Sequence, residues 1–225
     1  PVENLKPLFF DTAHAAYLAG YLAAGLSESG TVATFGGVPI PPVTVFMDGF
    51  VDGVAKYNEV KGDDVEVLGW DKEAQDGSFT GDFEDQNKGK QVTANFIQQG
   101  ADIILPVAGP VGLGAAAAAQ EADGVTLIWV DSDGFETAPD FSELFITSVL
   151  KRIDSATYAA TEEALSDEFT NEVYVGTLEN EGVGLAPYHD FEDQIDDELK
   201  AEVDELREQI ISGEIVVESP ASPQG

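Results

Sequence analysis

The residue that is hardest to explain as ordinary surface is Phe83, an aromatic within residues 76–90, a loop otherwise rich in Gly, Ser and acidic residues. One interpretation is that the ring packs beneath the loop as a small satellite core. The other is that the ring forms a stacking platform for a ligand, because an aromatic face binds planar groups. The residue types alone leave both interpretations open.

Three further residues could contact a ligand that is rich in oxygen atoms. Asp131 follows the apolar segment 125–130, and its carboxylate either accepts hydrogen bonds from two hydroxyls of a ribose or sugar, or caps the next turn. Lys151, one of only ten basic residues, either pairs with neighbouring acids or donates to such a ligand. Gly109, with further glycines three and five positions later, would let the backbone approach a ligand closely.

Residues that would support catalysis or metal binding are few. His14 lies inside a predicted helix, where we expect it to pack or to be exposed, and His189 lies in the segment APYHD near no serine or metal-ligand pattern. The chain has no P-loop, GxSxG, HExxH or EF-hand motif, and the glycines at 109, 112 and 114 do not fit the GxGxxG fingerprint. Since cysteine is also absent, we predict no catalytic residue, no metal and no cofactor, and a protein that is not an enzyme.

The charge of the chain restricts its partners. Its 43 acidic and 10 basic residues give a net charge of −33, spread along the sequence. Such a surface repels phosphate backbones and anionic lipid head groups, so we expect no nucleic-acid binding and no electrostatic docking to a membrane. No apolar run approaches the roughly 18 residues that a membrane-spanning helix needs.

Helical and strand patterns alternate over the first 134 residues. Helical periodicity covers residues 11–30, 41–58, 88–100 and 111–124, and short apolar runs typical of strands cover residues 31–37, 64–70, 101–109 and 125–134. This alternation predicts right-handed βαβ crossovers and a doubly wound parallel sheet, hence an α/β fold. Ligands bind at the carboxyl ends of such strands, which would bring residues 36–37, Phe83, Gly109 and Asp131 to one edge.

The rhythm changes in the remaining third of the chain. An extended segment running into a helix is expected over residues 145–168, and one or two strands over residues 171–188. A long charged helix over residues 196–213 should end at Gly213 and precede a last strand.

Several segments, in their order and spacing, resemble the basic membrane protein family: AAYLAGYLAA, TVATFGG, DGFVDGV, FEDQNKGK, GADIILPVAGPVGLG, VDSD and TSVLKRID. Its members are nucleoside-binding lipoproteins, the substrate-binding components of ABC transporters, with the two-lobed periplasmic-binding-protein fold of type I. A Phe-x-Asp-x-x-Lys-Gly element of the family matches Phe83, Asp85, Lys88 and Gly89. The resemblance implies that Phe83 stacks on a nucleobase, while Gly109, Asp131 and Lys151 line the ribose end of the cleft.

The resemblance also implies a domain organisation. Residues 1–37 and 149–178 would belong to an incomplete lobe one, residues 38–148 and 183–218 to lobe two, and residues 219–225 to a disordered tail. Both lobes would be doubly wound with parallel sheets, and the chain would cross between them at residues 36–41, 135–148 and 176–184. The segment GSFTGD would be an insertion, so that Phe79 would not be the stacking aromatic. Family members usually carry further residues, including a lipidated cysteine, before the part matched here, so lobe one is expected to expose apolar faces.

The expected function is capture of a nucleoside, with purines favoured, and its delivery to an ABC permease outside the cytoplasmic membrane. The protein would be periplasmic or a cell-surface lipoprotein, whose lipid anchor lies outside this chain. Three alternatives stay open: a receptor of the same fold for a sugar or another small metabolite, an enzyme of Rossmann or flavodoxin type, and a fragment that oligomerises through exposed apolar surface.

Overall fold

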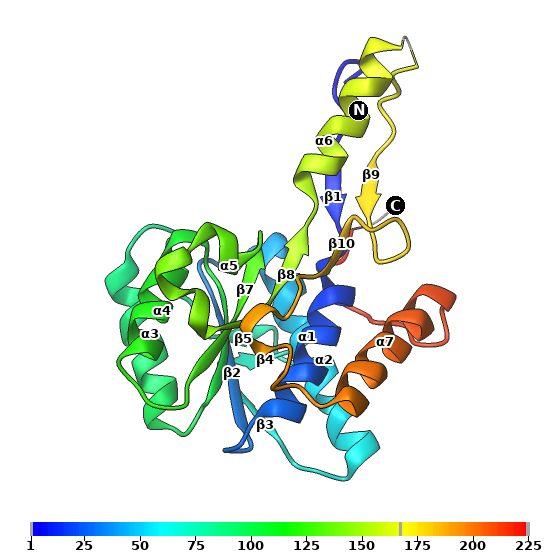
Figure 1. Cartoon of the computed structure of the whole chain (residues 1–225). Coiled ribbons are helices and arrows are strands. Elements are labelled where there is room, and N and C mark those ends of the chain that lie inside the picture. The colour runs from blue at the N-terminus through cyan, green and yellow to red at the C-terminus, as the bar shows by residue number, and fades with distance from the viewer. Residues whose placement is uncertain (1, 167, 224–225) are drawn as a thin grey trace.

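The computed structural model describes residues 2–166 and 168–223, and its main body is an α/β sandwich (Figure 1). The strands and helices follow in chain order: β1 (Leu8–Phe10), α1 (Thr12–Leu26), β2 (Thr31–Gly36), α2 (Pro41–Lys61), β3 (Glu66–Leu68), β4 (Trp70–Asp71), β5 (Asp76–Gly77), α3 (Gln86–Gln98), β6 (Ile103–Val107), α4 (Gly112–Gln120), β7 (Thr126–Asp131), α5 (Gly134–Thr137), β8 (Phe145–Lys151), α6 (Ile153–Leu165), β9 (Tyr174–Gly176), β10 (Val183–Leu185) and α7 (Asp197–Ser212). None of the described helices is both long and apolar enough to cross a membrane.

A six-stranded sheet forms the centre of the body, in the order β10-β8-β7-β6-β2-β3. All neighbouring strands are parallel except β10, which runs antiparallel to β8. Helices α3 and α4 cover one face, and α1, α2 and α7 cover the other (Figure 1). The strands are apolar on both sides because both faces are covered, as the fully buried run Ile103–Val107 illustrates. The predicted doubly wound parallel sheet is confirmed for this body.

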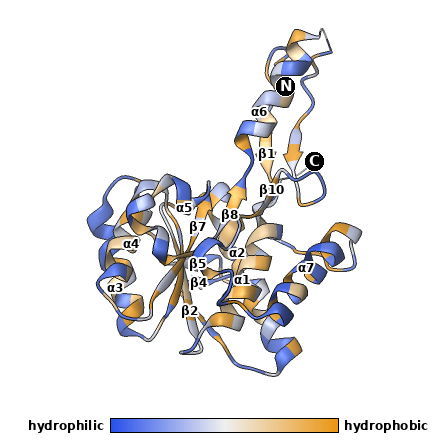
Figure 2. Ribbon diagram, viewed as in Figure 1, coloured by the Kyte–Doolittle hydropathy of each residue, from blue (hydrophilic) through white to orange (hydrophobic). Residues whose placement is uncertain are grey.

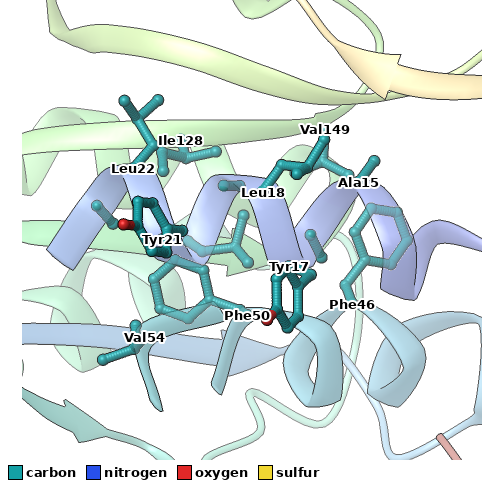
Figure 3. Packing of buried hydrophobic residues seen from close by; sticks show 14 of the residues in the cluster. Ala15, Tyr17, Leu18, Tyr21, Leu22, Phe46, Phe50, Val54, Ile128 and Val149 are labelled. Carbon is teal, nitrogen blue, oxygen red and sulfur yellow. The ribbon is translucent and has the colours of Figure 1, made fainter. Parts of the chain in front are cut away.

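Helices α1 and α2 lie side by side on this face, α1 against β8 and β10 and α2 against β2 and β6. Figure 3 shows Leu18 and Leu22 facing Val149 and Ile128 of the sheet, while α2 packs from the opposite side. The two helices approach closely because glycines line their contact. A Cβ added to Gly53, for example, would overlap the backbone carbonyl oxygen of Tyr17. This close packing makes a rigid support for the sheet edge where α2 begins.

A smaller part of the chain projects from the body and contains β1, α6 and β9 (Figure 1). Strands β1 and β9 pair in parallel, with Leu8 opposite Tyr174 and Phe10 opposite Gly176. Apolar residues concentrate on these strands as well as on the central sheet (Figure 2), and Phe9 is 48% exposed. The chain passes between body and projection after β1, after β8 and between β9 and β10.

The structure divides the chain differently from the expected lobe boundaries. Residues 1–37 were expected in lobe one. However, β2 lies between β6 and β3 in the central sheet, and α1 packs against α2. Of the strands and helices in this stretch, only β1 therefore belongs to the projection. The expected crossings at residues 36–41 and 135–148 lie within the body, the second of them including most of α5 and the start of β8, whereas residues 176–184 do run between body and projection. The reason is that β2 is buried on both faces and fits only inside a covered sheet.

The C-terminal segment contains no last strand, contrary to the prediction. Residues 214–218 pair with no described strand, and the segment is held instead by side chains. The buried carboxylate of Asp48 accepts hydrogen bonds from Trp70 Nε1 at 2.8 Å and from the Ser219 hydroxyl, while Ser222 donates to Asp11 at 2.9 Å. Of residues 219–225, the tail expected to be disordered, residues 224–225 lie outside the described residues.

Candidate functional site

The carboxyl edge of the sheet brings the four candidate residues into one row. Lys151 ends β8, Asp131 ends β7 and Gly109 follows β6, while Phe83 lies beside Gly37 at the end of β2. These four strands are neighbours in the sheet. With about 4.8 Å between adjacent strands, the row extends over about 14 Å. Hydrogen-bonding groups lie at one end and an aromatic ring at the other.

The Phe83 ring lies directly over Gly37. A Cβ added to Gly37 would overlap two carbons of the ring, and one added to Gly109 would lie 4.0 Å from the ring. Gly37 therefore leaves room for this side chain, whereas a side chain at Gly109 would only touch the ring. The ring is half-buried and packs against the edge of the core on the α1 and α2 side, so part of it is covered by the body and part is open. Part of the ring thus packs against the body, as the first interpretation expects, and the stacking platform for a ligand stays a prediction.

The other residues of the Phe-x-Asp-x-x-Lys-Gly element build the loop that carries Phe83. Asp85 caps the N-terminus of α3 by accepting from the backbone N–H of Asn87. Lys88 donates to Asp82, which also accepts from the N–H groups of Asp85 at 2.8 Å and Glu84 at 2.9 Å. These bonds from Asp85, Lys88 and Glu84 lower the pKa of the Asp82 carboxyl to about 2. The loop is therefore closed by its own hydrogen bonds.

Gly89 of the same element serves packing, and Phe79 packs against the core. A Cβ on Gly89 would overlap the Val111 carbonyl oxygen, so this glycine lets α3 approach the start of α4. Phe79 lies edge-on to Trp70, with ring centroids 5.9 Å apart, and packs against Gly36. Phe79 is half-buried like Phe83, but its ring packs on Trp70 and Gly36, whereas the Phe83 ring lies over Gly37.

Asp131 and Lys151 form an ion pair at the other end of the row. Lys151 Nζ lies 2.9 Å from Asp131 Oδ1 and 4.7 Å from the centre of the Phe46 ring. The Lys151 side chain is only 17% exposed and that of Asp131 is 48% exposed. The ammonium is therefore fixed by the carboxylate and by the aromatic face, in a position where both polar groups border open space.

Two hollows adjoin this ion pair. One, of about 520 Å³, is polar and includes Asp131, Asp133, Lys151 and His189 in its lining. The other, of about 480 Å³, lies between β1 and the start of α2 and is mainly apolar. A larger hollow of about 650 Å³ lies between α1, β10 and α7, and Arg152, which follows the end of β8, is also part of its lining. We place the site at the strand ends because the candidate groups converge there.

Sequence reasoning missed the contacts of His189. Its Nε2 lies 2.8 Å from Asp133 Oδ2, and its ring stacks on Phe135 with centroids 4.0 Å apart. No sequence signal linked these residues, since 56 positions separate His189 from Asp133. The other histidine, His14, lies half-buried on α1, 3.7 Å from Asp11. Among residues 2–166 and 168–223, no group of three His, Cys, Asp or Glu side chains is arranged to hold a metal ion.

The fold and the site define a class of protein. Type I periplasmic-binding proteins have a parallel α/β body that is joined by three crossings to a second part. This chain has the same arrangement, with its candidate binding groups along one carboxyl edge of the sheet. Solved structures of this class agree with it. The chain superposes on an ABC transporter solute-binding protein from Aeropyrum pernix K1 with a TM-score of 0.85 and 26% identity, covering 99% of this chain and 68% of that one. A second such protein, from Conexibacter woesei, gives a TM-score of 0.75 at 24% identity, again over 99% and 68%.

The chain belongs to the Bmp family, described as ABC transporter substrate-binding protein PnrA-like, which matches residues 2–220. Basic membrane protein B of Borrelia garinii subsp. bavariensis is 35% identical over 195 residues, 84% of this chain and 52% of that protein. The chain thus spans about half the length of the curated relatives it matches. The predicted family and fold class are confirmed, and the family is one of substrate-binding proteins rather than enzymes.

Proposed function

We propose that this protein captures a nucleoside along the carboxyl edge of its sheet as the substrate-binding component of an ABC transporter. The observation that carries the proposal is the row of candidate groups, with the half-open Phe83 ring at one end and the Asp131–Lys151 pair at the other. A nucleoside has the matching shape, with a flat base at one end and hydroxyl groups at the other.

Each candidate group has a role that its chemistry supports. The base stacks on Phe83, and stacking of this kind is worth roughly 1–3 kcal/mol per base. Asp131 accepts hydrogen bonds from two ribose hydroxyls, and Lys151 donates to a ribose oxygen. Gly109 has a positive φ of 53° and no side chain, so the ligand can lie close to the backbone between these ends.

A ligand without net charge suits this site. The Asp131–Lys151 pair is neutral as a unit, and the surrounding protein is strongly acidic. A purine base offers a larger face to Phe83 than a pyrimidine, which favours purine nucleosides.

The projecting part would contribute to binding as part of a second lobe. Strands β1 and β9 with α6 join the body through three crossings, and a hinge motion about these crossings would close the two parts on the ligand. The closed protein would deliver the nucleoside to an ABC permease outside the cytoplasmic membrane.

A ligand panel tests the proposal. The thermal midpoint of the chain is measured with purine and pyrimidine nucleosides, free bases, ribose and hexoses. A ligand present at about a hundred times its dissociation constant adds roughly 2.7 kcal/mol, which moves the midpoint of a chain of this size by about 5–11 °C. Weaker ligands are followed by NMR titration, in which the amide signals of Phe83, Gly109, Asp131 and Lys151 should shift.

The outcomes separate the candidate functions. Stabilisation by purine nucleosides that is lost in Phe83→Ala supports the proposal, because only a base needs the ring. A response to hexoses that survives Phe83→Ala would assign a sugar receptor instead. Conversion of a nucleoside by the pure protein would indicate an enzyme. If no nucleoside changes either the midpoint or the NMR signals of the folded chain, nucleoside capture is refuted.

A further inference from the structure

His189 lies outside the row of candidate groups but contacts the turn that carries one of them. It sits between β10 and α7, and its side chain is 20% exposed. Its imidazole stacks almost parallel on Phe135, at an interplanar angle of 10°, and its Nε2 lies 2.8 Å from Asp133 Oδ2. The backbone of His189 has a positive φ of 46°, a conformation uncommon for a residue with a side chain.

The turn that begins at Asp131 has an unusual backbone. Asp131 has a φ of 69°, and the N–H of Ser132 donates to the carbonyl oxygen of Val130 at 2.9 Å. A three-residue turn closed in this way around a residue with positive φ is the rarer, strained form of the γ-turn. Such a conformation persists only where the surrounding structure fixes it. The direction of the Asp131 carboxylate thus depends on what holds the following residues.

Residues 132–135 are held in part by α5, where the Asp133 carbonyl oxygen accepts from the N–H groups of Glu136 and Thr137, and His189 adds two side-chain contacts. Asp133 uses Oδ1 to accept from the N–H of Phe135 at 3.1 Å, which caps α5, and Oδ2 to contact His189. Gly134 donates its N–H to the buried hydroxyl of Ser148 at 3.0 Å. The Phe135 ring is covered by the imidazole. Without His189, the Asp133 carboxylate would keep only its bond from the Phe135 N–H, and the Phe135 ring would lose its stacking partner.

The charges in the polar hollow give Asp133 a second reason to need a partner. Besides Asp133, the carboxylates of Asp131, Glu136 and Asp154 line this hollow, facing Lys151 and Arg152. Lys151 pairs with Asp131, and it is the imidazole of His189 that lies against Asp133.

We propose that His189 is a positioning residue for ligand binding, which holds the turn at residues 131–135 so that the Asp131 carboxylate faces the ligand. The inference rests on the proposed function, in which Asp131 accepts hydrogen bonds from ribose hydroxyls. His189 itself does not touch the ligand. It acts through Asp133 and Phe135.

The test uses two substitutions of His189 and one matched control. His189→Phe keeps an aromatic ring against Phe135 but removes the N–H that faces Asp133. His189→Gln keeps a donor of similar reach. His14→Phe changes the other half-buried histidine, which lies on α1 beside a different carboxylate. Each variant is compared with the original chain for binding of a purine nucleoside and of its 2′,3′-dideoxy analogue, and for amide hydrogen exchange.

A positioning role predicts a selective loss. His189→Phe should bind the nucleoside at least 5-fold more weakly and the dideoxy analogue equally well, because the analogue lacks the hydroxyls that Asp131 would bind. His189→Gln should recover part of the affinity. Amide exchange at Ser132 and Phe135 should become at least 10-fold faster in His189→Phe and stay unchanged in His14→Phe.

Other results would overturn the inference without deciding the proposed function. Equal losses for nucleoside and analogue, or unchanged exchange at Ser132 and Phe135, would show that His189 does not position Asp131. If the original chain binds no nucleoside, the proposed function fails, and the exchange rates alone decide whether His189 holds the turn.

Discussion

Replacing Gly37 with alanine should weaken ligand binding without unfolding the protein. An added Cβ would overlap two carbons of the Phe83 ring and lie 3.0 Å from the Asp82 carbonyl oxygen. Gly37 has no positive φ, so alanine fits its backbone. Phe83 is half-buried and belongs to a loop, so the easiest adjustment is for the ring to turn away from the edge.

The size of the effect follows from the proposed stacking. If the ring turns away, the base loses roughly 1–3 kcal/mol, which corresponds to an affinity about 5- to 150-fold lower. If the ring stayed in place, the substitution would instead overpack the site and lower the free energy of unfolding by about 1–3 kcal/mol. We expect the first result, with a midpoint of thermal unfolding close to that of the unchanged chain.

Gly184→Ala is the matched control. Gly184 lies in β10, has no positive φ, and a Cβ there would meet no atom within 4 Å. The control therefore carries the same change in the flexibility of the unfolded chain without touching Phe83. Affinity for a purine nucleoside is measured by calorimetry for both variants and for Phe83→Ala. Undiminished affinity in Gly37→Ala with an unchanged thermal midpoint, or an equal loss of affinity in Gly184→Ala, would contradict this account of Phe83.

Three further predictions concern other parts of the structure. Asp131→Gly should leave the free energy of unfolding within about 1 kcal/mol of that of the original chain, because glycine relieves the strain of the positive φ and this offsets the lost ion pair. The same substitution should weaken nucleoside binding about 10- to 150-fold when measured by calorimetry. Gly53→Ala should lower the free energy of unfolding, measured by urea denaturation, by about 2 kcal/mol or more, because the added Cβ overlaps the Tyr17 carbonyl oxygen. This loss is expected even though alanine is the better helix former by about 1 kcal/mol. An increase in stability would refute the close helix packing. The Asp82 carboxyl should titrate in NMR near its lowered pKa of about 2. Its contribution to loop stability is therefore fully present above the pKa of an unfolded Asp and is lost as the pH falls towards 2. Lys88→Met should raise this pKa because it removes the hydrogen bond from Lys88.

Much of the body could be predicted because its strands are buried on both faces. Runs such as Ile103–Val107 and Thr126–Asp131 are continuous and apolar, a pattern that fits a covered parallel sheet and little else. Once the strands are known, the carboxyl edge follows, which is why residue types alone could place Gly109 and Asp131 together.

Features that depend on distant contacts could not be predicted. The segment after Gly213 has the valines of a strand, but its neighbours are the Asp48 carboxylate and the side chains around it, so the segment is tied down without joining a sheet. The position of β2 in the central sheet likewise depends on which strands pair with it. His189 carries no local signal at all, because its partners follow β7 while it follows β10.

The Phe-x-Asp-x-x-Lys-Gly element explains how a sequence motif can serve a site that most of its residues never touch. Asp85 caps α3, Lys88 pairs with Asp82, and Gly89 admits the carbonyl of Val111. Each of these contacts is made within the protein, and together they fix the loop from which Phe83 reaches Gly37. The motif is therefore a set of supports for one ring. Substituting a support should reduce affinity only to the extent that Phe83 moves, whereas substituting Phe83 should remove the stacking outright.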